Sequence, residues 1–277
     1  MPIITISRGS MSGGQALAAA IAAAVDAPCI GRELVIEAAA RLGVPGDVLR
    51  QKMEKSPGMW DRMTHDRRMY VTALQAALAE HVATGNVVYH GFVGHLLLRS
   101  VPAVLRVRVI APVALRVRAV MDQHGWSKAA AERHIGQVDE DRSRWVRFIY
   151  DEDISDPRLY DLVVNLEAFG LESACACVTE LARRPEFTIT PGVSQQLRDF
   201  ALACRVRVAL AAAPPTRTLG LTVSAQEGVV TVEGEVPDAA MITDISARWE
   251  AEVRPIVEAV GGVARVDLRL RAVYPHA

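Results

Sequence analysis

The feature that most constrains the fold of this chain stands at its start. A run of β-forming residues, expected as a strand over residues 3–7, leads into the glycine- and serine-rich loop SRGSMSGG and then into an alanine-rich helix expected over residues 15–25. Glycines let backbone N–H groups converge in such a loop, and the helix N-terminus adds a partial positive charge. The pattern predicts an anion-binding loop within an α/β fold.

This loop lacks two side chains of a complete P-loop. A loop of the form G-x-x-x-x-G-K-[ST] places its lysine on the β- and γ-phosphates and its hydroxyl on Mg²⁺. Here Gln15 and Ala16 follow Gly13 and Gly14, so the lysine and the hydroxyl are both missing. The loop by itself leaves two interpretations open: a nucleotide site, or a tight turn that lets the helix pack close to the sheet.

Strands and helices alternate through the first two-thirds of the chain. Further strands are expected over residues 86–90, 104–110 and 159–165, where short β-forming runs such as NVVYH and VLRVRVI occur. Helical patterns cover residues 32–42, 48–55, 60–84, 128–147 and 171–183, and one more helix begins at Pro112. Because the strands are separated by helices, we expect a parallel sheet with helices on both faces. The first helix, apolar at nearly every position, is expected to be buried all round.

The pattern changes after residue 184. Residues 185–193 carry prolines and no periodicity, and they are interpreted as a linker between domains 1–184 and 194–277. The second domain is expected to contain a helix, two strands joined by a hairpin turn, a helix that Pro255 kinks or divides, and a last strand, over residues 194–213, 219–224, 229–233, 239–260 and 263–270. The predicted fold class is α/β, with a small αββαβ domain after the parallel sheet.

Composition excludes several classes of function. The formal net charge is -1 and hydrophobic residues make up 51% of the chain, as in ordinary globular proteins. This nearly neutral charge does not indicate a surface that binds nucleic acid. No apolar run approaches the roughly 18 residues that span a bilayer. The start lacks a basic segment followed by an uninterrupted apolar run, so we expect a cytoplasmic protein. The four cysteines show no metal-binding spacing and are expected to be buried free thiols.

The N-terminal stretch ITISRGSMSGGQALAAAIAAAVDAPCIGRELVIEAA is similar to the start of the cytidylate kinase-like family, a branch of the nucleoside monophosphate kinases. The similarity continues through GNVVYHGFVGHLL, VLRVRVIAPVALRVRAVM and HIGQVDEDRSRW and ends with DPRLYDLVVN, so it covers residues 1–184. The resemblance implies a P-loop nucleoside monophosphate kinase-like fold. It also implies ATP and Mg²⁺ as cofactors, and phosphoryl transfer to a nucleotide such as CMP.

The resemblance also implies which residues contact phosphates. The nucleotide phosphates would be held by the loop and by the start of the helix after the third strand, at Arg8, Ser10, Ser12, Gly13, Gly14, Gln15, Arg116 and Arg118. Arg8 would replace the missing lysine. A catalytic lid would consist of Asp139, Arg142 and Arg144, since arginines offer forked donors to phosphate. The alternative is a solvated helix whose charges form local ion pairs, for example Asp139 with Arg142.

The sequence departs from the family where acceptor chemistry is expected. The family's arginine after the second strand grips the acceptor phosphate, whereas here Gly91 is followed by Phe92. Arg32 is kept, so the acceptor site would consist of Arg32, Gly91 and Phe92. His90 and His95 flank the same turn, at the strand end where α/β sheets bind ligands.

Two functions follow from these departures. Phosphoryl transfer depends on positioning and charge neutralisation, so each lost cation lowers its rate. The first hypothesis is a weak or divergent nucleoside monophosphate kinase. The second is a catalytically inactive nucleotide-sensing or scaffolding protein.

The C-terminal segment resembles a BON domain in the stretches LTVSAQEGVVTVEGEV and VGGVARVDLRL. Gly228, Gly234 and Gly262 match the glycines of that module. The resemblance implies binding of a small ligand, a lipid or a protein partner, without catalytic residues. The alternative is a tail domain that serves dimerisation and makes the protein a homo-oligomer.

Overall fold

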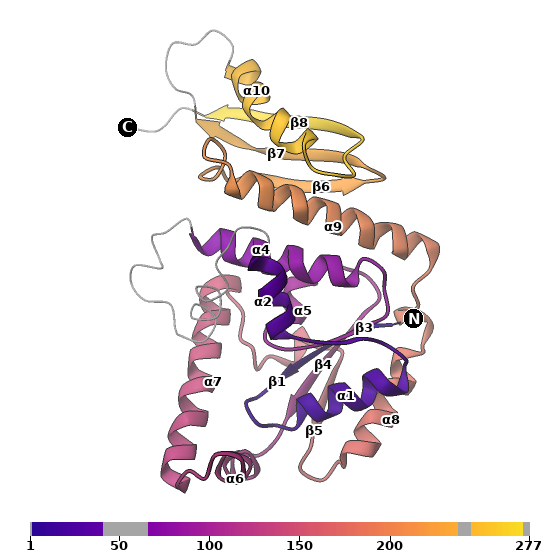
Figure 1. Ribbon diagram of the computed structural model, residues 1–277, viewed down its shortest axis with the longest axis vertical. Coiled ribbons are helices and arrows are strands. Elements are labelled where there is room, and N and C mark those ends of the chain that lie inside the picture. Colours follow the sequence, from indigo (N-terminus) through magenta and orange to yellow (C-terminus); the bar gives the residue numbers. More distant parts are fainter. Residues whose placement is uncertain (1, 41–65, 238–244, 274–277) are drawn as a thin grey trace.

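The computed structural model describes residues 2–40, 66–237 and 245–273 and shows two lobes, one above the other (Figure 1). The first lobe contains a five-stranded sheet between helices, and the second contains a three-stranded sheet. The α/β fold class is therefore confirmed. The helix expected over residues 48–55, and the first residues of the helix expected over 60–84, lie outside the described residues.

The five strands of the first sheet are all parallel, in the order β2-β3-β1-β4-β5. They are β1 Ile3–Arg8, β2 Cys29–Gly31, β3 Val87–His90, β4 Val104–Ile110 and β5 Leu162–Asn165. β1 is the central strand, and its isoleucines are fully buried because helices cover both faces of the sheet. The glycine-rich loop that follows β1 therefore opens at the middle of the carboxyl edge of the sheet.

Two strand predictions were incomplete. β2 was not predicted, because three residues are too few to show an alternating pattern. β5 begins at Leu162 rather than at residue 159. The preceding residues form the 3₁₀ turn η2, Pro157–Leu159, in which the Asp156 side chain accepts a hydrogen bond from the backbone N–H of Arg158.

The helices of the first lobe divide between the two faces of the sheet (Figure 1). α1 and α8 pack on one face, α2, α4, α5 and α7 pack on the other, and α6 packs on α7. Their bounds are α1 Gly14–Ala24, α2 Arg32–Ala40, α4 Asp66–Val82, α5 Gly94–Leu97, α6 Val113–His124, α7 Lys128–Tyr150 and α8 Leu171–Ala182. No helix in the described part of the chain is long and apolar enough to cross a membrane.

The expectation that the first helix is buried all round was wrong. Leu17, Ala18, Ile21 and Ala22 form the buried face of α1, whereas Ala19 is exposed. Alanine tolerates both environments, because its methyl group exposes little apolar surface. The helix therefore packs on the sheet with one face only.

The second lobe has the expected αββαβ order. It consists of α9 Pro191–Ala212, β6 Thr222–Gln226, β7 Val229–Pro237, α10 Ile245–Glu258 and β8 Arg265–Val273. β6 and β7 are antiparallel and joined by Glu227 and Gly228, whose φ angles of 48° and 81° suit a two-residue hairpin turn. β8 pairs with β7 in parallel. Pro255 lies inside α10 and does not divide it.

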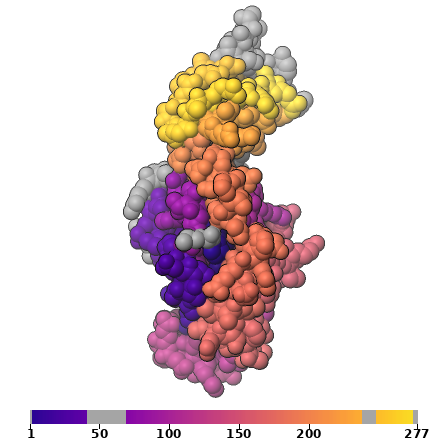
Figure 2. Space-filling view, turned by 90° about the vertical axis from the view of Figure 1, so that its right-hand side faces the viewer, coloured from indigo at the N-terminus to yellow at the C-terminus, as the bar shows by residue number. Residues whose placement is uncertain are grey.

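Helix α9 belongs to the cores of both lobes. Ala201, Cys204 and Val208 pack against the alanines of α4. Leu202 and Val206, together with Leu210, pack under the sheet of the second lobe. Figure 2 shows the segment from α8 into α9 as a continuous band along one side of the molecule, below the cap formed by the rest of the second lobe. The boundary expected at residues 185–193 stays a prediction.

The prediction that all four thiols are buried was wrong. Cys204 is buried on α9, but Cys29 and Cys177 are exposed, and Cys175 is half-buried. Cys175 and Cys177 lie two residues apart on α8, so they point to different sides of the helix, and only one side faces the sheet.

Candidate anion-binding site

The loop between β1 and α1 has the backbone geometry that an anion site needs. Met11 and Gly13 adopt left-handed φ angles of 56° and 80°, and Gly13 is the residue that precedes α1. The first N–H groups of α1 have no acceptor within the helix. Ser12 is buried, and its hydroxyl donates to the carbonyl oxygen of Gly9 at 3.1 Å, so this side chain holds the loop in shape.

Two arginines meet at this loop. Arg8 ends β1, and its side chain lies against Gly14, where a Cβ atom would stand 2.9 Å from the Arg8 Cδ. Arg142, from α7, donates from Nη1 to the carbonyl oxygen of Arg8 at 3.2 Å. Among the described residues, neither arginine forms an ion pair with a carboxylate.

Burial and like charge lower the pKa of both groups. Burial first, and then the nearby charges of Arg8 and Arg32, lower the pKa of Arg142 to about 10, although the charge of Asp139 acts in the opposite direction. The pKa of Arg8 is also lowered, first by burial and then by Arg32. Both guanidinium groups remain charged at neutral pH, so the site holds positive charge that lacks a close counter-ion.

A cavity of about 290 Å³, here named the loop cavity, opens beside these arginines. Its walls come from the ends of β1 and β4, from α6 and α7, and from the loop after α7. The charged residues that line it are Arg8, Arg108, Arg116, Arg142, Asp139 and Asp153. It lies at the carboxyl edge of the parallel sheet, where folds of this type bind their ligands.

Arg116 and Asp139 form a bidentate ion pair with N–O distances of 2.7 and 2.8 Å. Arg116 Nε also donates to the carbonyl oxygen of Ser10 at 2.6 Å, so α6, α7 and the loop are tied together. The family resemblance placed Arg116 on phosphate and Asp139 in catalysis, but in the structure each neutralises the other. The ion pair expected between Asp139 and Arg142 does not form.

Other expected phosphate ligands do not line the cavity, including the loop residues Ser10, Ser12, Gly13 and Gly14. Arg144 is half-exposed and pairs with Asp141 at 3.2 Å and with Glu140 at 3.6 Å, as the alternative of local ion pairs on α7 predicted. Arg118 and Gln15 are exposed. Thus only Arg142 of the expected lid arginines reaches the loop.

The expected acceptor residues separate into two groups. Arg32, at the start of α2, lies beside Gly91, where a Cβ atom would stand 3.4 Å from the Arg32 Cβ. Phe92 is only 5% exposed, and its ring meets that of Trp145 edge-on at a centroid distance of 5.1 Å. Arg142 lies 5.8 Å from the Phe92 ring centroid. Phe92 is therefore part of the core that supports Arg142.

A partly buried cluster of polar side chains lies at this edge of the sheet. Among its members, the sequence patterns pointed only to His95 as a possible ligand contact. Arg108 donates to the Ser7 hydroxyl at 2.9 Å and lies 5.7 Å from the ring centroid of Tyr160. His95 is 2% exposed and packs on Tyr160, and burial lowers its pKa to about 3. The alternation in VLRVRVI places Arg108 opposite its buried valines, and that was the available signal.

The side chains at this site suit phosphate groups better than they suit Mg²⁺. The helix N-terminus, Arg8 and Arg142 suit the phosphate groups. For the metal, the hydroxyl of Ser12 donates to backbone carbonyls, and the Asp139 carboxylate is held by Arg116. Within residues 2–40, 66–237 and 245–273, no group of three or more metal-ligating side chains occurs.

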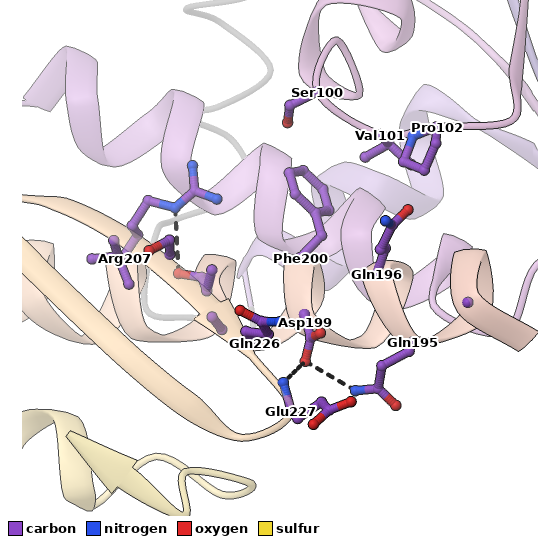
Figure 3. A pocket seen from close by; sticks show the side chains of 15 residues that line it. Ser100, Val101, Pro102, Gln195, Gln196, Asp199, Phe200, Arg207, Gln226 and Glu227 are labelled. Atoms are coloured by element: carbon purple, nitrogen blue, oxygen red, sulfur yellow. Dashed lines mark hydrogen bonds between the residues drawn. The ribbon is translucent and has the colours of Figure 1, made fainter. Parts of the chain in front are cut away.

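A second cavity, of about 820 Å³, lies between α9, β6 and residues 100–102 (Figure 3). At one end, the Asp199 carboxylate accepts hydrogen bonds from Gln195 Nε2 at 3.0 Å and from the backbone N–H of Glu227 at 2.9 Å. Arg207 donates to Gln75 Oε1 at 2.8 Å, which joins α9 to α4. These groups hold α9 in place, and none of them lines the loop cavity.

Comparison with known proteins agrees with this architecture. Residues 3–168 match the cytidylate kinase-like family. An uncharacterized protein from Eubacterium ventriosum has 18% sequence identity and a TM-score of 0.52, with 65% of this chain and 97% of that chain covered. This similarity shows the fold of the first lobe. No curated protein matches the sequence significantly.

Two kinase structures align over a similar share of the chain with lower scores. A shikimate kinase from Bacteroides thetaiotaomicron has 17% identity and a TM-score of 0.42, covering 66% of this chain and 99% of that chain. A gluconokinase from Sinorhizobium meliloti has 17% identity and a TM-score of 0.41, covering 65% and 93%.

Proposed function

The chain belongs to the cytidylate kinase-like family, and we propose that it binds the phosphates of a nucleotide at the loop between β1 and α1. One observation carries this proposal: Arg8 and Arg142 line the loop cavity without a carboxylate partner among the described residues. Two neighbouring positive charges in a partly buried site repel each other until an anion neutralises them. A phosphate group at the α1 N-terminus supplies that anion.

We also propose that phosphoryl transfer from ATP to an acceptor such as CMP is slow or absent. In that reaction the bond between the γ-phosphorus and the ADP oxygen breaks while a bond to an oxygen of the acceptor phosphate forms, so charge must be balanced throughout. Gln15 supplies no charge, Arg116 is neutralised by Asp139, and Phe92 replaces the arginine that grips the acceptor. Each such loss costs on the order of 10²–10³ in rate.

A nucleotide-sensing protein without catalysis is the second candidate, and the position of α7 favours it. This helix is fixed to the loop by the Arg116–Asp139 pair and to the core by Trp145. In this arrangement α7 is docked on the first lobe through contacts between the protein's own side chains and backbone. Occupancy of the loop then changes the strength of existing contacts instead of closing a lid.

The second lobe is proposed to be a BON-like module that begins after a linker at residues 185–193 and binds a small ligand, a protein or a second copy of the chain. The αββαβ order and the left-handed φ of 81° and 97° at Gly228 and Gly262 support this assignment. In the sensing hypothesis this lobe would carry the output.

The test combines binding with turnover. Thermal unfolding is measured with a panel of nucleoside mono-, di- and triphosphates, and the ligands that stabilise the protein are then tested for phosphoryl transfer by product chromatography. Binding with turnover well below the 1–100 s⁻¹ typical of kinases is expected. Turnover in that range would refute the loss of catalysis, and the lack of any stabilising nucleotide would refute the nucleotide site.

A further inference from the structure

We propose that this site takes the metal-free form of a polyphosphate, because its cavity holds two guanidinium groups without a carboxylate partner among the residues that the structure describes, while the carboxylates that line it are engaged by other groups. The inference rests on the proposed nucleotide site and specifies the chemical state of its ligand. It concerns Arg8 and Arg142, together with the carboxylates around them.

The first observation is the position of Arg8. Its aliphatic stem fills the space beside Gly14, where a Cβ atom would lie 2.7 Å from the Arg8 Cβ and 2.9 Å from its Cδ. The side chain is thus held over the first turn of α1. Its Nε is buried and has no hydrogen-bond partner. A buried N–H donor without an acceptor is costly, and a phosphate oxygen would satisfy it.

The second observation is the support of Arg142. One hydrogen bond to the Arg8 carbonyl oxygen and the face of the Phe92 ring hold its guanidinium group. These contacts orient the side chain but leave its charge without a carboxylate within ion-pair distance. An oriented guanidinium group is suited to bidentate contact with phosphate oxygens.

The third observation concerns the carboxylates that a metal would need. Asp139 lines the cavity, but both of its oxygens accept hydrogen bonds from Arg116. Asp153 also lines the cavity, and its Oδ1 accepts bonds from the backbone N–H and the hydroxyl of Ser155. In the described part of the chain, the cavity therefore offers a cation no carboxylate that is not already engaged.

These observations determine whether the site prefers the metal-free triphosphate or its Mg²⁺ complex. Mg²⁺ removes two negative charges from a triphosphate, and near two arginines the more negative, metal-free triphosphate is attracted more strongly. A magnesium ion at the same place would also be repelled by the guanidinium groups. Magnesium should therefore compete with the protein for the triphosphate.

The experiment is a calorimetric titration of the full-length protein with ATP in EDTA, in excess MgCl₂, and in NaCl of matched ionic strength. We expect binding in EDTA and in NaCl, and an affinity at least about tenfold weaker in MgCl₂. Inorganic tripolyphosphate should show the same order. Arg142→Gln should weaken ATP binding in EDTA by at least about tenfold, as the loss of a charged hydrogen-bond donor implies. Arg133→Gln, an exposed position on the same helix, should leave it unchanged.

The outcomes distinguish a failure of this inference, which concerns the metal-free form of the ligand, from a failure of the proposed nucleotide site. Tighter binding in MgCl₂ than in EDTA overturns the inference and leaves the nucleotide site standing. Equal affinity of wild type and Arg142→Gln in EDTA also overturns it. No binding in any buffer overturns both. The comparison of ATP affinity between buffers uses the wild-type protein alone. The inference therefore stays testable even if Arg142→Gln does not fold.

Discussion

Replacing Phe92 by arginine tests whether this position belongs to the site or to the core. The family resemblance places an acceptor-binding arginine here, so Phe92→Arg would restore a phosphate contact. In the structure the side chain is 5% exposed, meets Trp145 edge-on, and lies under Arg142. We therefore expect the variant to lose stability without gaining affinity for CMP.

The magnitude follows from the loss of packing. Removing a buried phenylalanine ring costs about 3–5 kcal/mol of unfolding free energy. The new charge adds to this cost, because the cation of Arg142 lies over this position, 5.8 Å from the Phe92 ring centroid. With about 3 kcal/mol as the smallest loss and about 2–4 °C per kcal/mol for a domain of this size, the midpoint of thermal unfolding should fall by at least about 6 °C.

Phe92→Leu is the matched control, since it keeps an apolar side chain and introduces no charge. It loses mainly the edge-to-face contact, about 1 kcal/mol, so its melting midpoint should fall by about 2–4 °C. Both variants are measured by scanning calorimetry and then titrated with CMP. A Phe92→Arg protein that melts within about 2 °C of wild type and binds CMP more tightly would refute the assignment of Phe92 to the core.

Three further predictions use the same site. Asp139→Asn leaves a buried guanidinium without its carboxylate, and urea unfolding should show a loss of about 2–3 kcal/mol; an unchanged midpoint would contradict the structural role of the pair. His95, with its pKa lowered to about 3, stays neutral in the fold while the unfolded chain gains a proton near pH 6.5, so stability is full above that pH and falls toward pH 3. At pH 5 the free energy of unfolding should be lower by about 2 kcal/mol, and His95→Phe should remove this decrease. The same decrease in stability at acid pH in both proteins would refute the role of His95. Gly14→Ala should displace Arg8 and abolish stabilisation by ATP, whereas Gly136→Ala, where a Cβ meets open space in α7, should stabilise by up to about 1 kcal/mol. Thermal shifts compare the two glycine variants, and retained ATP stabilisation in Gly14→Ala would argue against Arg8.

The sequence predicted the elements whose patterns are local. Short runs of β-forming residues between helical patterns mark strands, so four of the five strands of the first sheet could be placed, while β2 is too short to show such a run. The Arg116–Asp139 pair joins two helices and spans 23 residues, and no spacing rule for side chains on one helix can show it. The role of Phe92 likewise depends on Trp145, which reaches it only because α7 folds back onto the sheet.

Helix α9 decides where this chain can be divided for expression. A fragment that stops before α9 uncovers Ala76 and Ala79 on α4, which are almost completely buried in the whole chain. A fragment that stops after α9 covers them but leaves Val206 and Leu210 open to water. Either product presents an apolar stripe of the kind that drives self-association. Fusion partners and tags therefore belong at the ends of the whole chain, and one lobe cannot be exchanged without redesigning the surface that α9 offers to the other.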